Sequence, residues 1–137
     1  MNFFNNSLSA NKYLRIIKLS PKKLSKEFIL RNFGLLIGDK SFYKILICFQ
    51  LLEETKNIKG DIIEFGIWNG NNLFTIKKII DFLKIKKKIY GYDNFSGFPN
   101  PESVNKKNKK FGIYAGNRKF LRFVINFFKL KNIEIID

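Results

Sequence analysis

The stretch IIEFGIWNGNN, residues 62–72, decides the fold of this 137-residue chain. Its first residues have the length and isoleucine content of a short buried strand. An acid, Glu64, is followed by Gly66 and Gly70, with Trp68 between the two glycines. Because glycine permits tight turns and brings the backbone close to a ligand, the stretch predicts a strand that ends in a ligand-binding turn.

Hydrophobic periodicity on both sides of this stretch predicts an alternation of helices and strands. We expect two short helices in residues 1–40, further helices at 41–54, 72–88 and 117–130, and strands at 61–67, 88–93 and 132–137. The 72–88 helix buries one apolar face and ends in lysines that suit the helix dipole. The apolar residues on that face are Leu73, Ile76, Ile80 and Leu83, and in the last helix Phe120, Val124, Phe127 and Phe128 recur at helical spacing.

This order predicts an α/β fold, a Rossmann-like doubly wound parallel sheet of which the chain holds the first βαβαβ half, preceded by N-terminal helices. Residues 1–40 would form a helical lid or packing segment, with a cationic membrane-surface helix as the alternative, and residues 41–137 a half domain. Since such sheets normally continue, we expect a fragment that is truncated at the C-terminus.

Composition limits the classes of function. The formal charge of +15 comes from 26 Lys and Arg against 11 acids, which indicates either a solvated lysine-rich surface or an anionic partner. The chain has no histidine, so Ser-His, Cys-His and His-metal chemistry are excluded within it. Cys48 is the sole cysteine and is expected to be buried. With no apolar run of about 18 residues and no secretory signal, a cytoplasmic protein without a membrane span is expected.

The predicted site lies at the carboxyl ends of the first two strands, where open α/β sheets bind ligands. Glu64 and its glycine loop end the first strand, and Asp93 ends the second. An acid there can accept both hydroxyls of a ribose, while the next helix offers N–H groups to a carboxylate. Neither the G-x-G-x-x-G pattern nor a Walker loop is present, so S-adenosylmethionine, which has no phosphate, fits best. The alternative is a plain strand-to-helix turn.

Two segments, GDIIEFGIWNGNNL and KIYGYDNFSGFPNP, resemble the macrocin O-methyltransferase (TylF-like) family of S-adenosylmethionine-dependent sugar O-methyltransferases, and the similarity spans residues 37–137. The resemblance implies that Glu64, Gly66 and Gly70 form the methionine-side loop around Trp68. It further implies that Asn72 meets the methionine carboxylate, that Asp93 holds the ribose, and that Gly97, Phe98 and Pro99 shape the cofactor loop together with Phe95.

The resemblance also implies Mg²⁺, held by aspartates beyond a fourth strand, which this chain lacks. No catalytic residue or metal ligand is therefore assigned, and we expect weak S-adenosylmethionine binding without turnover. The substrate would be a small sugar, glycoside or polysaccharide precursor, with no nucleic acid, and a homo-oligomer is compatible with the sequence. Two alternatives stay open. One is a non-catalytic remnant or partner subunit, and the other is a basic nucleic-acid-binding module built on the cations around Phe111 and Tyr114.

Overall fold

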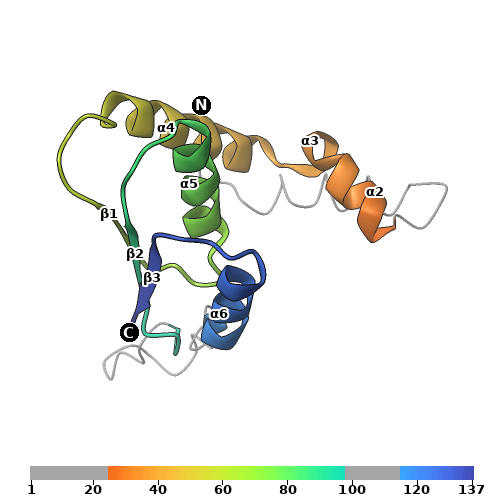
Figure 1. Cartoon of the computed structure of the whole chain (residues 1–137). Helices are drawn as coiled ribbons and strands as arrows, with labels where there is room; N and C mark the ends of the chain where they lie inside the picture. The colour runs from red at the N-terminus through yellow and green to blue at the C-terminus, as the bar shows by residue number, and fades with distance from the viewer. Residues whose placement is uncertain (1–24, 98–114) are drawn as a thin grey trace, which may run out of the picture. The chain divides into compact units, whose positions relative to one another are not determined.

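The computed structural model describes residues 25–97 and 115–137 (Figure 1). Their contacts divide the chain into two units, Met1–Gln50 and Leu51–Asp137, which are described separately. The described elements are α2 (Lys26–Arg31), α3 (Phe33–Leu36), α4 (Asp39–Glu54), β1 (Ile62–Phe65), α5 (Asn71–Phe82), β2 (Ile89–Tyr92), α6 (Arg118–Phe127) and β3 (Ile133–Ile136). The predicted boundary after residue 40 stays a prediction, and the first predicted helix lies outside the described residues.

The described part of the first unit consists of α2, α3 and most of α4, and none of their side chains is fully buried. Helix α2 is capped by Ser25, whose hydroxyl accepts a hydrogen bond from the Phe28 N–H at 3.0 Å, and it ends where Asn32 leaves the helical conformation. The break at Asn32 divides residues 22–36, which the sequence predicts as the second of the two short helices. In α2, α3 and α4, all within the described part of the chain, no side chain is buried. The helix predicted at 41–54 is confirmed as α4, where Cys48 is half-buried rather than buried.

The second unit is built on a parallel sheet in the order β1-β2-β3. The register places Ile62 opposite Ile89 and Ile89 opposite Ile133. Helix α5 connects β1 to β2 and α6 connects β2 to β3. Because both connections join neighbouring parallel strands, right-handed crossovers place the two helices on one face of the sheet (Figure 1). The predicted α/β fold, a partial Rossmann-like sheet, is confirmed.

The core forms between that face of the sheet and the two helices. Its buried members are Ile67, Leu73, Ile76, Ile80, Ile89 and Leu121. The prediction for α5 is confirmed for its first three core positions, while Leu83 is only half-buried at the end of the helix. A Cβ at Gly91 would lie 3.0 Å from the Ile67 side chain, so the site loop packs directly on β2.

Helix α5 ends six residues earlier than the sequence predicts. It stops at Phe82, and Lys84 has a left-handed backbone with φ 54°. The lysines that follow therefore lie beyond the helix, and the predicted interaction with its dipole is wrong. Lys87 instead stabilises the segment before β1, because its Nζ donates a hydrogen bond to the Gly60 carbonyl at 2.9 Å.

The predicted last helix is confirmed as α6, but most of the residues at helical spacing do not face the core. Leu121 is fully buried and Val124 is half-buried, whereas Phe120, Phe127 and Phe128 are exposed by 51%, 66% and 64%. Apolar residues cover one broad side of this helix, and contact with the core selects Leu121 within that side.

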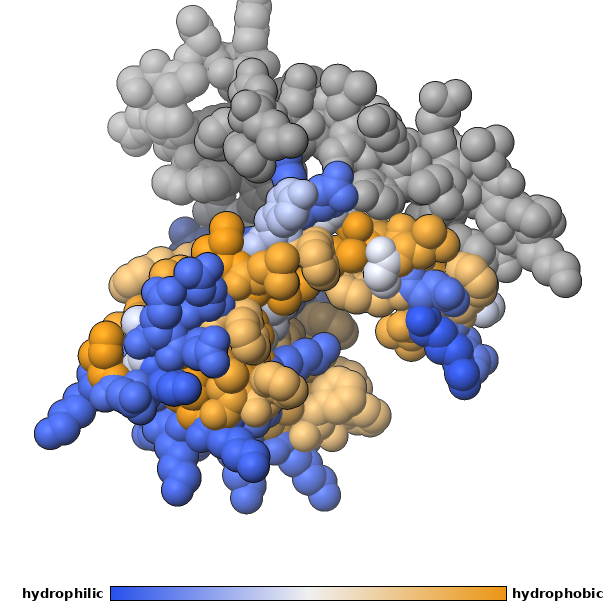
Figure 2. Space-filling view, turned by 90° about the horizontal axis from the view of Figure 1, so that it is seen from above, coloured by the Kyte–Doolittle hydropathy of each residue, from blue (hydrophilic) through white to orange (hydrophobic). Residues whose placement is uncertain are grey.

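Large hydrophobic side chains also lie at the surface elsewhere in the chain. On the sheet face opposite α5 and α6, Phe65 is 77% exposed and stacks on Tyr92 with ring centroids 5.2 Å apart. Figure 2 shows hydrophobic residues at the surface next to long hydrophilic side chains. Among the described residues, no helix combines the length and apolar character needed to cross a bilayer.

Candidate cofactor-binding site

The loop after β1 is held in a compact turn by main-chain conformations and hydrogen bonds. Gly66, Trp68 and Gly70 have φ of 75°, 48° and 78°, a region that costs glycine little and tryptophan more. The Gly70 N–H donates to the Ile67 carbonyl at 2.7 Å. Two glycines thus let the chain reverse between β1 and α5, and the strained residue between them is the tryptophan.

Glu64 connects the end of β1 to the start of α5. Its Oε1 accepts a hydrogen bond from Asn72 Nδ2 at 3.0 Å, and both side chains are half-buried. This contact fixes the direction of the Glu64 carboxylate. The Asn72 amide thus donates to a carboxylate of the protein itself, whereas the family resemblance implies that Asn72 meets the methionine carboxylate of the cofactor.

Asp93 joins the loop after β2 to the loop after β1. Its Oδ2 accepts from the Trp68 N–H and its Oδ1 from the Phe95 N–H, both at 2.7 Å. The Gly66 N–H also donates to the Tyr92 carbonyl at 2.8 Å. The structure therefore places Asp93 and the Glu64 loop at the same edge of the sheet, and one carboxylate orders the backbone of both loops.

The two loop glycines have different surroundings. A Cβ at Gly66 would meet no atom of the described residues within 4 Å, so the space beside it is open. A Cβ at Gly70 would lie 2.5 Å from Leu121 Cδ2 and 2.8 Å from the Phe74 ring. Gly70 is thus required for packing against α6, while Gly66 leaves room for a ligand.

The start of α6 forms a further wall of the site, which the sequence analysis missed. The Asn117 N–H donates to Asn69 Oδ1 at 3.2 Å, and a Cβ at Gly116 would lie 2.5 Å from the Trp68 carbonyl oxygen. The Asn117 side chain also caps α6 by accepting from the Phe120 N–H at 2.9 Å. A glycine and an asparagine before a helical pattern indicate a helix start, but no local signal shows which loop that start contacts.

Arg118 brings the end of β3 to the same edge. Its guanidinium forms an ion pair with Asp137, directly after β3, and lies 6.0 Å from the centre of the Phe95 ring. Each of the three neighbouring strands thus has an acid near its carboxyl end, within a strongly basic chain: Glu64 in β1, Asp93 after β2 and Asp137 after β3. In residues 25–97 and 115–137, no three His, Cys, Asp or Glu side chains gather in a group that could hold a metal ion.

Several predicted features lie outside the described residues. Among them are two members of the cofactor loop, Phe98 and Pro99, and most of the basic and aromatic segment of the nucleic-acid alternative. The remaining predicted site residues are described, and the hydrogen bonds above connect all of them except Gly97, whose carbonyl accepts from Asn94 Nδ2 at 3.4 Å. Their roles toward a cofactor stay predictions.

Comparisons with known proteins agree with this geometry. The sequence model described as macrocin-O-methyltransferase (TylF) matches residues 32–123, more than half of the chain. No individually curated protein matches the sequence at a significant level.

Three solved structures are similar in fold. The calicheamicin methyltransferase CalS11 is 17% identical with a TM-score of 0.69, over 95% of this chain and 56% of that one. An apo structure of CalS11, described as a TDP-rhamnose 3'-O-methyltransferase, is 17% identical with a TM-score of 0.65, over 95% of this chain and 54% of that one. The O-methyltransferase NovP is 20% identical with a TM-score of 0.55, over 73% of this chain and 45% of that one. The chain thus spans about half the length of these enzymes.

Proposed function

Because the chain belongs to the macrocin-O-methyltransferase (TylF) family, we propose that it is the cofactor-binding part of an S-adenosylmethionine-dependent O-methyltransferase acting on a sugar hydroxyl. One observation carries this proposal. The Glu64 loop and Asp93 meet at the carboxyl ends of neighbouring parallel strands, beside the open space at Gly66. One structural neighbour is described as a TDP-rhamnose 3'-O-methyltransferase, which supports a sugar or glycoside acceptor.

The amino end of α5 suits the methionine carboxylate of the cofactor. Gly70, the N-cap of this 12-residue helix, has no side chain with which to cap it. Helix N-termini attract anions through their N–H groups and the helix dipole. Glu64, held in place by Asn72, would then face the positively charged amino group of the same methionine tail.

Asp93 can hold the ribose while it orders the two loops. A carboxylate has about four lone-pair sites, and the two main-chain N–H groups occupy one site on each oxygen. The other sites can accept two vicinal hydroxyls. Phe95, positioned by Asp93 and by the Arg118 guanidinium, would offer an apolar surface to the base.

When bound, S-adenosylmethionine supplies an activated methyl group. The contribution of this chain is to position that group, and orientation of two reactants is itself a large source of catalysis. We assign no proton acceptor for the sugar hydroxyl. The described residues offer no set of ligands for the Mg²⁺ that the family resemblance implies, so we derive no step through a metal. Contacts to the acceptor would come from parts of the fold that the longer relatives possess.

A fluorescence titration tests the proposal. Trp68 is the only tryptophan, is 42% exposed, and lies in the proposed loop. Its emission should change with S-adenosylhomocysteine and stay constant with NAD, whose pyrophosphate the loop does not fit. Calorimetry with the same two ligands would check the result. Unchanged emission and no heat up to millimolar S-adenosylhomocysteine would reject the proposal in favour of a non-catalytic remnant.

A further inference from the structure

Helix α6 displays a row of aromatic side chains toward solvent. We call this row the α6 aromatic stripe, and it consists of Phe120, Phe123 and Phe127 of α6 together with Phe128, the residue that caps its end. These four side chains are 51–66% exposed. The rings also pack on one another, with centroids 5.7 Å apart between Phe123 and Phe127 and 5.1 Å apart between Phe127 and Phe128. Contiguous exposed apolar surface of this kind marks a place of interaction.

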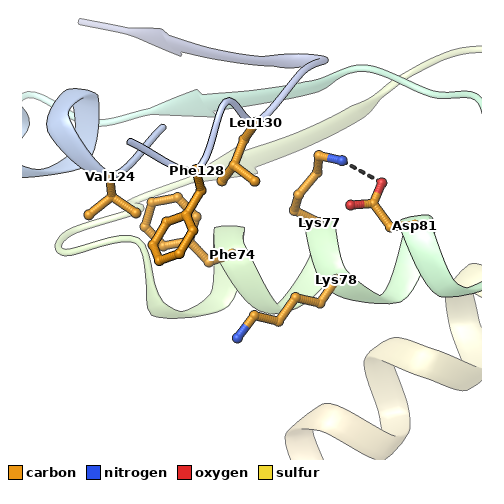
Figure 3. Close-up of a pocket in the computed structure, with 7 residues that line it drawn as sticks. All are labelled: Phe74, Lys77, Lys78, Asp81, Val124, Phe128 and Leu130. Carbon is orange, nitrogen blue, oxygen red and sulfur yellow. Dashed lines mark hydrogen bonds and ion pairs between the residues drawn. The ribbon is translucent and has the colours of Figure 1, made fainter. Parts of the chain in front are cut away.

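An apolar groove extends the stripe onto α5 (Figure 3). The groove has a volume of about 300 Å³, and its apolar walls are Phe74, Val124, Phe128 and Leu130. Phe128 belongs to both features, so the stripe and the groove form one surface. On the α5 side of the groove, Lys77 is ion-paired with Asp81 while the Lys78 ammonium points outward from the helix (Figure 3).

Basic side chains border this surface. Residues 118–131 include Arg118, Lys119, Arg122, Lys129 and Lys131 and contain no acid, and of these cations Arg118 is ion-paired with Asp137. At 100° per residue, Lys119 falls beside Phe123 of the stripe and nearly opposite Leu121, while Arg122 lies midway between Phe123 and Leu121 on the polar side of α6. A helix with an aromatic face, a cationic flank and little net hydrophobicity is typical of segments that lie in the interface of anionic membranes.

We propose that the α6 aromatic stripe docks on an anionic lipid surface, as a peripheral contact separate from the cofactor site. The phenylalanines would enter the boundary between headgroups and acyl chains, and the flanking lysines and arginines would contact the headgroup phosphates. Each cation near such a surface strengthens binding about fivefold.

The same contacts disfavour two other partners. Pairing with a second copy of the chain through this surface would place its cations against one another, and like charges in an interface weaken binding. A single nucleic-acid strand needs open ring faces on which bases stack. Here the rings of Phe123 and Phe127 are stacked on each other, with an angle of 28° between their planes.

Vesicle co-sedimentation of the full chain tests the proposal. We expect binding to vesicles made of equal parts phosphatidylcholine and phosphatidylglycerol, little binding to phosphatidylcholine alone, and weakening by salt. The double variant Phe123→Ser/Phe127→Ser should bind the anionic vesicles at least about tenfold more weakly, because the inserted apolar area is lost. Lys119→Gln/Arg122→Gln should weaken binding to the anionic vesicles alone.

Phe82→Ser is the matched control, because Phe82 is 76% exposed at the end of α5, outside the stripe. It should bind the anionic vesicles like the wild type. Circular dichroism melting would verify that the stripe variants stay folded, as expected for side chains that are mostly exposed.

The proposal would be overturned by three results. The first is no preference for anionic over neutral vesicles, and the second is equal loss of binding in the control and stripe variants. The third is a dimer, or a complex with single-stranded RNA, that the wild type forms and the stripe variant loses while vesicle binding is unchanged. None of these measurements involves S-adenosylhomocysteine, so failure here leaves the proposed methyltransferase function untouched.

Discussion

Replacing Asp93 by asparagine tests whether one carboxylate both orders the site and binds the cofactor. In the native chain its two oxygens accept the N–H groups of Trp68 and Phe95, both at 2.7 Å. Asparagine keeps one acceptor oxygen, and its amide nitrogen would face the other N–H donor. The substitution therefore removes one loop contact, creates a clash of donors, and removes the negative charge offered to a ribose.

The expected losses differ for stability and for affinity. A hydrogen bond to a charged group contributes about 1.5–3 kcal/mol to stability. Because solvent weakens the bond at this half-exposed site, the free energy of unfolding should fall by about 1–2 kcal/mol. Cofactor affinity should fall further, by about tenfold to a hundredfold, because both ribose contacts and loop order are lost.

Asp61→Asn provides a matched control at the opposite edge of the sheet. Asp61 precedes β1, and its Oδ1 accepts the Lys88 N–H just before β2 at 2.9 Å. This variant removes the same charge from a carboxylate that also bonds a main-chain N–H, but its amide can still present one oxygen to one donor. We expect a loss of about 0.5 kcal/mol in stability and unchanged binding of S-adenosylhomocysteine.

Urea unfolding and the Trp68 titration measure the two quantities on the same samples. Equal ligand affinity in Asp93→Asn and in the wild type would refute the ribose role, whatever happens to stability. Equal stability in those two proteins would refute the claim that Asp93 orders the loops. If Asp61→Asn lost as much affinity for S-adenosylhomocysteine as Asp93→Asn, the titration would be reporting the overall stability of the protein and not a contact at the site.

Three further substitutions have separable effects. Leu121→Ala, at the fully buried position of α6, should lower the free energy of unfolding by about 2–5 kcal/mol in a denaturant titration. Gly66→Ala should lose cofactor affinity in the Trp68 titration through the left-handed φ of 75° and the side chain placed in open space, and an unchanged affinity would remove Gly66 from the ligand's path. Gly116→Ala should shift the Trp68 emission even without ligand, because its Cβ would press on the Trp68 carbonyl, and an identical spectrum would contradict the close packing.

Local signals in the sequence were sufficient for the order of elements. In α5 the apolar residues recur at helical spacing and polar residues separate them, so Leu73, Ile76 and Ile80 could be assigned to the core. In α6 the apolar residues cover one broad side of the helix, and the part of that side that faces inward depends on which residue fits beside Gly70. That fit is a tertiary contact between Leu121 and the loop, for which no periodic signal exists.

The site was partly predictable for a similar reason. Glu64 and Asp93 could be placed together because parallel strands end at the same edge of a sheet. What the sequence could not show is that Asp93 also accepts two main-chain hydrogen bonds. Likewise, Asn117 contacts Asn69 across 48 residues of chain, and only the folded structure reveals that the start of α6 belongs to the site.

The two sides of helix α6 make different contacts, one with the cofactor site and the other with solvent. Asn117, before its first turn, bonds to the site loop, and Leu121 fills the space beside Gly70. Phe123 and Phe127 point toward solvent. The cofactor site therefore depends on residues of α6 that the proposed lipid contact does not use. Substitutions in the stripe should change vesicle binding without changing cofactor affinity, whereas loss of Leu121 should weaken both, because it releases the helix from the core.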